Sequence, residues 1–187
     1  MNIRTFIALE LSDEAKQELS RVTGLLKKVD ADVKWATPEA IHITLKFLGN
    51  IPEKKTTFVI ESLKLVVSQI PSFDITLGGI GVFPGWSAPR ILWIDINEGH
   101  ESLEKLAGSI RSVMFKAGFG EDERQFSPHI TVGRIKSGRN KAVLRKEAGL
   151  IEVVPILIPI SRVTFFKSIL TKEGARHTVL SAWDLTG

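Results

Sequence analysis

The sequence predicts an α+β protein built as two lobes, each with a largely antiparallel sheet and helices on its outer face. The predicted strands and helices follow one another in the order β-α-β-α-β-β-α-β-(α)-β-β. Both halves contain a helix, a strand with the sequence His-x-Thr, a further helix and a pair of strands. Helices on one face of each sheet leave the other faces free to form a central cleft. We therefore expect the 187 residues to form one two-lobed domain over 1–187.

The first elements are indicated by apolar periodicity and by capping residues. Arg4–Leu11 has the pattern of a buried strand, and Ser12 is placed to cap a helix with acidic residues in its first turn. The apolar stripe of this helix is Ala15, Leu19, Val22 and Leu26. A short strand is expected at Val33–Trp35. The strand Ile41–Gly49 then contains the first His-x-Thr sequence.

The middle of the chain contains two further helices and two strands. The helix that opens at Pro52 has the apolar stripe Val59, Leu63, Val66 and Ile70. Phe73–Phe83 and Arg90–Asn97 are predicted strands, joined by a loop rich in proline and glycine. The next helix has the stripe Leu103, Leu106, Ile110, Val113 and Ala117. Gly118 is placed to end it.

The last third of the chain completes the second half. The second His-x-Thr sequence lies in the predicted strand His129–Ile135, and Lys141–Ala148 is predicted to be helical. Two strands, Val163–Leu170 and His177–Asp184, follow on either side of a turn at Lys172–Gly174.

Composition and charge restrict the classes of protein that the chain can form. Hydrophobic residues make up 43% and charged residues 25%, which is typical of a folded globular protein. The chain has no cysteine, which excludes disulfides and thiolate metal sites. It has neither the apolar core of a signal peptide nor the roughly 18 apolar residues of a membrane span. We therefore expect a monomeric, cytoplasmic protein.

The chain is basic, with a net charge of +4 and a sequence pI of about 9.4. One interpretation is an ordinary solvated surface rich in lysine. The other is a surface for an anionic ligand such as RNA. Charge alone leaves both interpretations open.

The alternation of side chains along a strand places each histidine beside its threonine. In the first strand one face, expected to meet the helices, carries Ile41, Ile43, Leu45 and Phe47. The opposite face carries His42, Thr44 and Lys46. In the second strand, Ile130 and Val132 share the core face, and His129 and Thr131 share the other. Each histidine and threonine can therefore meet on a single ligand group.

Two histidines and two threonines suit acid–base chemistry on a phosphodiester. Imidazole has a pKa of about 6.5, so one ring can donate a proton while another accepts one. Threonine hydroxyls can hold the non-bridging oxygens. A single His-x-Thr is more often structural, but two copies at equivalent places favour a shared site. His100 and His177 lack such a threonine and are interpreted as surface or secondary residues.

Two other catalytic arrangements fit this pattern poorly. A Ser-His-Asp arrangement would need a nucleophile and an orienting acid, and neither histidine has an obvious one. Zinc would need a third ligand at a recognisable spacing. We therefore expect no metal and no cofactor.

A run of cations follows the second histidine strand: Arg134, Lys136, Arg139, Lys141, Arg145 and Lys146. This run can be read as a solvated loop and helix, or as a surface for the phosphates of a nucleic-acid strand. Strict alternation places Arg134 on the face opposite His129. Arg134 can reach the site only if the strand ends or bulges near Gly133.

These residues resemble the two-histidine phosphoesterase superfamily, and within it the RNA 2′,3′-cyclic phosphodiesterases first described as 2′-5′ RNA ligases. The resemblance extends over almost the whole chain. It is carried by Arg4-x-Phe6-Ile7-Ala8, Ile41 to Gly49, Gly81-Val82-Phe83-Pro84, Pro89 to Trp93, His129-x-Thr131-x-x-Arg134, and Phe166-x-Ser168 with Gly174. The closing hairpin of this family often has a tyrosine that would contact the substrate. His177 stands there in this chain, which contains no tyrosine.

The resemblance implies a bilobal fold with pseudo-twofold symmetry and metal-independent hydrolysis of an RNA-terminal 2′,3′-cyclic phosphate to a 2′-phosphate. It implies that His42 donates a proton to the leaving 3′ oxygen and that His129 activates water. Thr44, Thr131 and Arg134 would bind the phosphoryl oxygens. The partner would be RNA with a cyclic phosphate end, with tRNA fragments as one source.

Three alternatives to this hydrolase stay open. The chain could join RNA ends through 2′-5′ bonds, hydrolyse small cyclic nucleotides, or bind RNA ends without catalysis. The residues alone also leave open which histidine is the acid and which is the base.

Overall fold

The computed structural model of the protein describes residues 1–120, 125–171 and 174–187. The α-helices are α1 (Asp13–Lys27), α2 (Thr56–Val67), α3 (His100–Lys116) and α4 (Lys141–Leu150). The strands are β1 (Asn2–Leu9), β2 (Val33–Trp35), β3 (Ile43–Pro52), β4 (Phe73–Phe83), β5 (Ile91–Glu98), β6 (His129–Ile135), β7 (Leu157–Ile160), β8 (Arg162–Leu170) and β9 (Ala175–Asp184). Short 3₁₀ turns, Pro38–Ala40 and Glu53–Lys55, precede β3 and α2.

The strands form two sheets, with orders β3-β1-β8-β9 and β2-β6-β5-β4-β7. The named strands pair antiparallel throughout the described ranges. Each His-x-Thr strand pairs with the strand that comes before the preceding α-helix. Strand β3 pairs with β1, and β6 pairs with β5. The next strand in each sheet, β8 or β4, comes from the other half of the chain. The predicted α+β architecture of two antiparallel sheets is confirmed.

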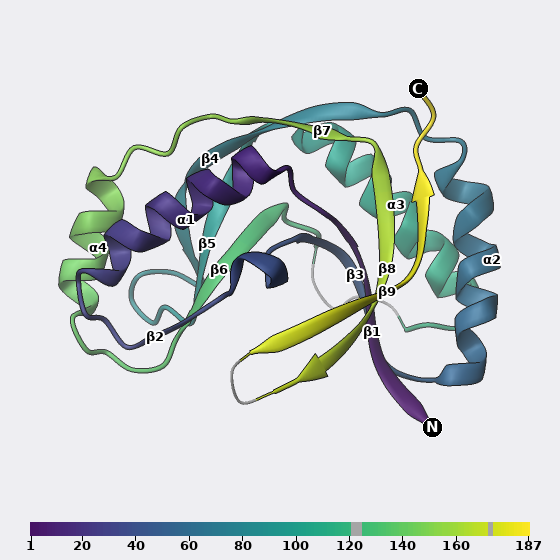
Figure 1. Ribbon diagram of the computed structural model, residues 1–187, viewed down its shortest axis with the longest axis horizontal. Coiled ribbons are helices and arrows are strands. Elements are labelled where there is room, and N and C mark those ends of the chain that lie inside the picture. The colour runs from purple at the N-terminus through teal and green to yellow at the C-terminus, as the bar shows by residue number, and fades with distance from the viewer. Residues whose placement is uncertain (121–124, 172–173) are drawn as a thin grey trace.

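The helices divide between the two sheets (Figure 1). Helices α2 and α3 pack together beside the four-stranded sheet, and α1 and α4 lie beside the five-stranded sheet. The apolar stripe predicted for α1 is fully buried. Burial of each Leu or Val in it contributes about 1.5–3 kcal/mol. Ser12 caps this helix as predicted, since its hydroxyl accepts a hydrogen bond of 3.2 Å from the Ala15 amide.

Several details of the predicted elements change. Strand β3 begins at Ile43, one residue after His42, and the last buried residue of α3 is Met114 rather than Val113 or Ala117. In α2 the third buried residue is Val67 rather than Val66. Strand β3 continues beyond Gly49 to Pro52. Strand β7 was not predicted; it contains Pro159 and lies at the edge of its sheet, where a proline is tolerated. In the turn predicted at 172–174, Lys172 and Glu173 lie outside the described residues.

One cluster of buried hydrophobic side chains includes members from both sheets and all four helices. The His-x-Thr strands therefore rest on a common core. Among the described helices, none has both the length and the apolar composition to cross a bilayer.

Candidate active site

Strand β3 departs from regular pairing three residues after His42. Across β1 and β3, Ala8 pairs with Thr44 and Ile7 pairs with Lys46, so the register skips Leu45. A skipped residue in an antiparallel pair is a β-bulge, which interrupts the alternation of side chains. Leu45 and Lys46 are accordingly both buried, at 3% and 4% exposure.

Strand β6 bulges at the equivalent place, three residues after His129. Across β5 and β6, Trp93 pairs with Thr131 and Leu92 pairs with Gly133, so the register skips Val132. Val132 and Gly133 are both buried. The two His-x-Thr strands therefore share a backbone irregularity as well as a sequence.

The bulge in β3 corrects the faces predicted for two side chains. Lys46 was expected beside His42, but it is buried, and its ammonium donates a hydrogen bond of 2.9 Å to the Gly120 carbonyl. Phe47 was expected toward the helices, but it is 53% exposed, and its ring lies 5.8 Å from that of Phe6. Strict alternation fails here because the bulge reverses the facing of the residues that directly follow it, up to a second register shift at Leu48.

The bulge in β6 has the same consequence for Arg134. The sequence allowed Arg134 to share a face with His129 only if the strand bulged near Gly133, and the register has that bulge. Arg134 is exposed and corresponds by position to Phe47 in the first strand.

Each histidine makes the same kind of local hydrogen bond, to the carbonyl oxygen two residues before it. Nδ1 of His42 lies 2.8 Å from the Ala40 carbonyl oxygen, and Nδ1 of His129 lies 2.7 Å from that of Ser127. A carbonyl oxygen only accepts hydrogen bonds, so Nδ1 carries a proton in both rings. Nε2 of each ring is therefore the nitrogen left to exchange a proton with a ligand.

Thr44 and Thr131 are half-buried, and each stands two residues after its histidine. Within the described residues, neither hydroxyl has a hydrogen-bond partner. Both hydroxyls are therefore available to a ligand. In the same part of the chain, no three His, Asp or Glu side chains are grouped as metal ligands.

Aromatic rings line the site on both sides and were not predicted as site residues. Phe6 stacks on His42 with ring centroids 4.6 Å apart, and Phe166 stacks on Phe6 at 5.2 Å. On the other side, Phe83 contacts His129 edge-on at 5.0 Å and stacks on Trp93 at 4.8 Å. Alternation in the neighbouring strands could have indicated Phe6 and Trp93, because they pair beside the His-x-Thr strands.

His177 belongs to the site, although the sequence indicated a surface or secondary residue. Its ring lies 5.3 Å from His42 and 4.9 Å from Phe6, edge-on to both. Its Nδ1 is buried and has no hydrogen-bond partner among the described residues. By contrast, His100 lies at the start of α3, where its Nε2 is 2.6 Å from the Ile96 carbonyl oxygen.

Burial lowers the pKa of His42 to about 4. Burial is the largest cause of this value. The charges that His177 and His129 can carry also lower the pKa, and the hydrogen bond to Ala40 raises it. Burial, followed by the charge of Arg4, also lowers the pKa of His177. Because His129 acts on the pKa of His42, the histidines of the two sheets share one electrostatic environment. At neutral pH the His42 ring is uncharged in the free protein.

The lowered pKa of His42 predicts a loss of stability in mild acid. The unfolded chain takes up a proton near pH 6.5, whereas the folded protein does so only near pH 4. The free energy of unfolding should therefore fall as the pH drops through this window, by about 3 kcal/mol from this group. Urea unfolding between pH 7 and pH 4 measures the change. His42→Asn, whose amide can still bond the Ala40 carbonyl, should show a shallower pH dependence. Equal slopes would contradict the prediction.

The fold is shared with solved structures of other proteins. Over 99% of both chains it matches the crystal structure of TT0787 of Thermus thermophilus, with a TM-score of 0.82 and 24% identity. It also matches E. coli LigT, solved with 3′-AMP, over 100% of both chains with a TM-score of 0.78 and 22% identity. This likeness shows that the chain shares their fold.

The model of the LigT-like phosphoesterase family matches the chain twice, at residues 9–93 and 94–177. The chain therefore belongs to the LigT-like phosphoesterase family. It is 33% identical to a protein of Methanothermobacter thermautotrophicus named RNA 2′,3′-cyclic phosphodiesterase, over 99% of this chain and 100% of the relative. A protein of Thermotoga maritima with the same name is 34% identical, over 95% of this chain and 93% of the relative.

Proposed function

We propose that this protein hydrolyses the 2′,3′-cyclic phosphate at the end of an RNA strand to a 2′-phosphate, without a metal. The proposal is carried by the matched construction of β3 and β6. Each strand presents an imidazole anchored through Nδ1 and a threonine hydroxyl without a partner in the described chain. The names of the relatives from Methanothermobacter and Thermotoga support the same activity.

In the proposed reaction His129 and His42 act on opposite sides of the phosphorus. Nε2 of His129 removes a proton from water, and the water oxygen forms a bond to phosphorus. The bond between phosphorus and the 3′ oxygen breaks, and Nε2 of His42 gives its proton to that oxygen. Thr44 and Thr131 donate hydrogen bonds to the non-bridging oxygens, and Arg134 adds positive charge beside them.

The donor role requires His42 to be protonated, although burial favours its neutral form. A bound cyclic phosphate carries a negative charge, which favours the imidazolium and raises the pKa of His42. Substrate binding and proton uptake are therefore coupled. The free protein keeps the His42 ring uncharged, and the substrate itself brings this ring to its reactive form.

The activity is tested with an RNA oligonucleotide that ends in a 2′,3′-cyclic phosphate, in the presence of a chelator. We expect terminal 2′-phosphate as the product and a bell-shaped dependence of rate on pH, because one ring must be charged and the other neutral. Chromatography against 2′- and 3′-phosphate standards identifies the product. A 3′-phosphate product would show that the 2′ oxygen leaves, which contradicts the proposed step. Cyclic ends that persist while RNA binds would favour an RNA-end binding protein instead.

A further inference from the structure

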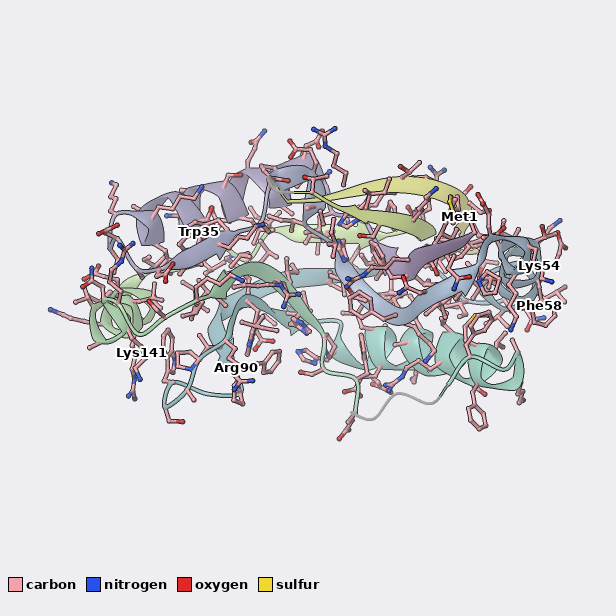
Figure 2. All side chains as sticks on the ribbon, turned by 90° about the horizontal axis from the view of Figure 1, so that it is seen from below. Met1, Trp35, Lys54, Phe58, Arg90 and Lys141 are labelled. Carbon is pink, nitrogen blue, oxygen red and sulfur yellow. The ribbon has the colours of Figure 1, made fainter. Side chains whose placement is uncertain are left out.

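A pocket of about 560 Å³ continues from the end of β6, beyond the His-x-Thr sequence. It lies between the loop that joins β4 to β5 and the loop that leads into α4. Four cations line it: Arg90, Arg134, Lys136 and Lys141. Figure 2 shows Arg90 and Lys141 along the same edge of the molecule.

The positive charge of this pocket is not neutralised by the described part of the protein. Arg21, Arg139 and Arg162 each form an ion pair with a carboxylate at 2.7 to 3.3 Å. None of the four pocket cations has such a pair within the described residues. Four unpaired positive charges around one pocket repel one another and favour an anion between them.

Hydrogen bonds connect the segments that line the pocket. The Arg90 amide donates to the Phe83 carbonyl at 2.8 Å, and the Arg90 carbonyl accepts from the Ile135 amide at 2.9 Å. The Lys141 ammonium donates to the Ser87 carbonyl at 3.0 Å, which links the start of α4 to the β4–β5 loop. The two segments on either side of the pocket are therefore connected by a hydrogen bond in the free protein.

Only some of the cations in the run from Arg134 to Lys146 line this pocket. Arg139 is paired with Asp30, and Arg145 and Lys146 do not line the pocket. Arg90, which is distant in sequence, takes their place. Arg134 is three strand positions from Thr131, or roughly 10 Å at about 3.3 Å per residue. The pocket therefore begins beside the candidate site and leads away from it.

Resting on the proposed function, we infer that this pocket binds the phosphodiester that joins the terminal nucleotide of the RNA to the nucleotide before it. The preferred substrate is then an oligonucleotide rather than a mononucleoside cyclic phosphate. Arg90 and Lys141 contact the backbone phosphate, which carries no base information, so this preference is independent of sequence. Arg134 lies between the pocket and the reacting phosphate.

The test compares two substrates with the same terminal nucleoside, a mononucleoside 2′,3′-cyclic phosphate and a short oligonucleotide with that end. The double variant R90A/K141A should lower the ratio of kcat/KM for the oligonucleotide to that for the mononucleotide by about tenfold or more. The slope of log kcat/KM against log salt for the oligonucleotide should become shallower by about 0.7 for each lost phosphate contact. R90E changes the charge of the pocket by the same two units and should lower the ratio as well.

The matched control is K54A/K64A, which removes the same charge from exposed positions on the α2 side of the molecule. Figure 2 shows Lys54 at the opposite end from Lys141. An unchanged ratio in R90A/K141A, or an equal fall in the control, would overturn the inference. If the native protein hydrolyses neither substrate, the proposed function fails, and anisotropy with a labelled oligonucleotide ending in a 2′-phosphate tests the pocket separately. Weaker binding by R90A/K141A than by the control would then support the pocket, and equal binding would overturn it.

Discussion

Replacing His42 by alanine is expected to lower kcat for cyclic phosphate hydrolysis by about 10²–10⁴-fold, the usual contribution of a positioned acid or base. The interaction is made only as the 3′ oxygen departs, so kcat and kcat/KM should fall together. Steady-state kinetics on the oligonucleotide substrate measure both. His129→Ala should cause a loss of similar size, because its Nε2 is the proposed acceptor of the water proton.

The pH profiles of the two variants separate the two roles. Without its proton donor, His42→Ala should have a rate that rises with pH and then stays level. Without its base, His129→Ala should have a rate that falls as the pH rises. If the two profiles were reversed, His42 would be the base and His129 would be the acid.

The control for both variants is His100→Ala, which removes an imidazole bound to the Ile96 carbonyl. It should leave kcat close to that of the native protein. The double variant of His42 and His129 should lose less than the product of the single losses, because the two rings act in one step. An unchanged rate in His42→Ala would remove this ring from the chemistry, whatever its contacts.

The second large effect is expected from Gly81→Ala, through the ring of Trp93. A Cβ at Gly81 would overlap Cζ2 of Trp93, so the indole would have to move. Trp93 stacks on Phe83, whose ring meets His129 edge-on. We expect a loss of about 1–3 kcal/mol in unfolding free energy, as for overpacked cores, together with a clear fall in kcat. Urea unfolding and steady-state kinetics measure the two effects.

The same strand offers a matched control for this substitution. Apart from its chain neighbours, no described residue comes within 4 Å of a Cβ at Gly79, so Gly79→Ala should keep both stability and rate. Gly79 and Gly81 both lie on β4, but only Gly81 faces the Trp93 ring. If both variants were equally stable and equally active, the indole would be free to shift, and its packing would not position His129.

The local elements of this protein follow from patterns of neighbouring residues. Spacings of two to four positions, which are visible in the sequence, predict these local features. They are the apolar stripe of α1, its Ser12 cap and the shared face of His42 and Thr44. The repeat of these patterns in both halves was enough to predict two antiparallel sheets. The residues of the candidate site were indicated in the same way, and their roles remain predictions.

Contacts between distant segments decided the rest, because they depend on which strands pair and in what register. The bulges after His42 and His129 arise in pairing with β1 and β5, and they turn Lys46 inward and Arg134 outward. His177 meets His42 only because β8 and β9 extend the sheet that contains β3. The pKa of His42 follows from burial in that assembled sheet rather than from the residues beside it in the chain. Spacing along the chain specifies which side chains share a face, whereas burial and partners exist only once the sheets have formed.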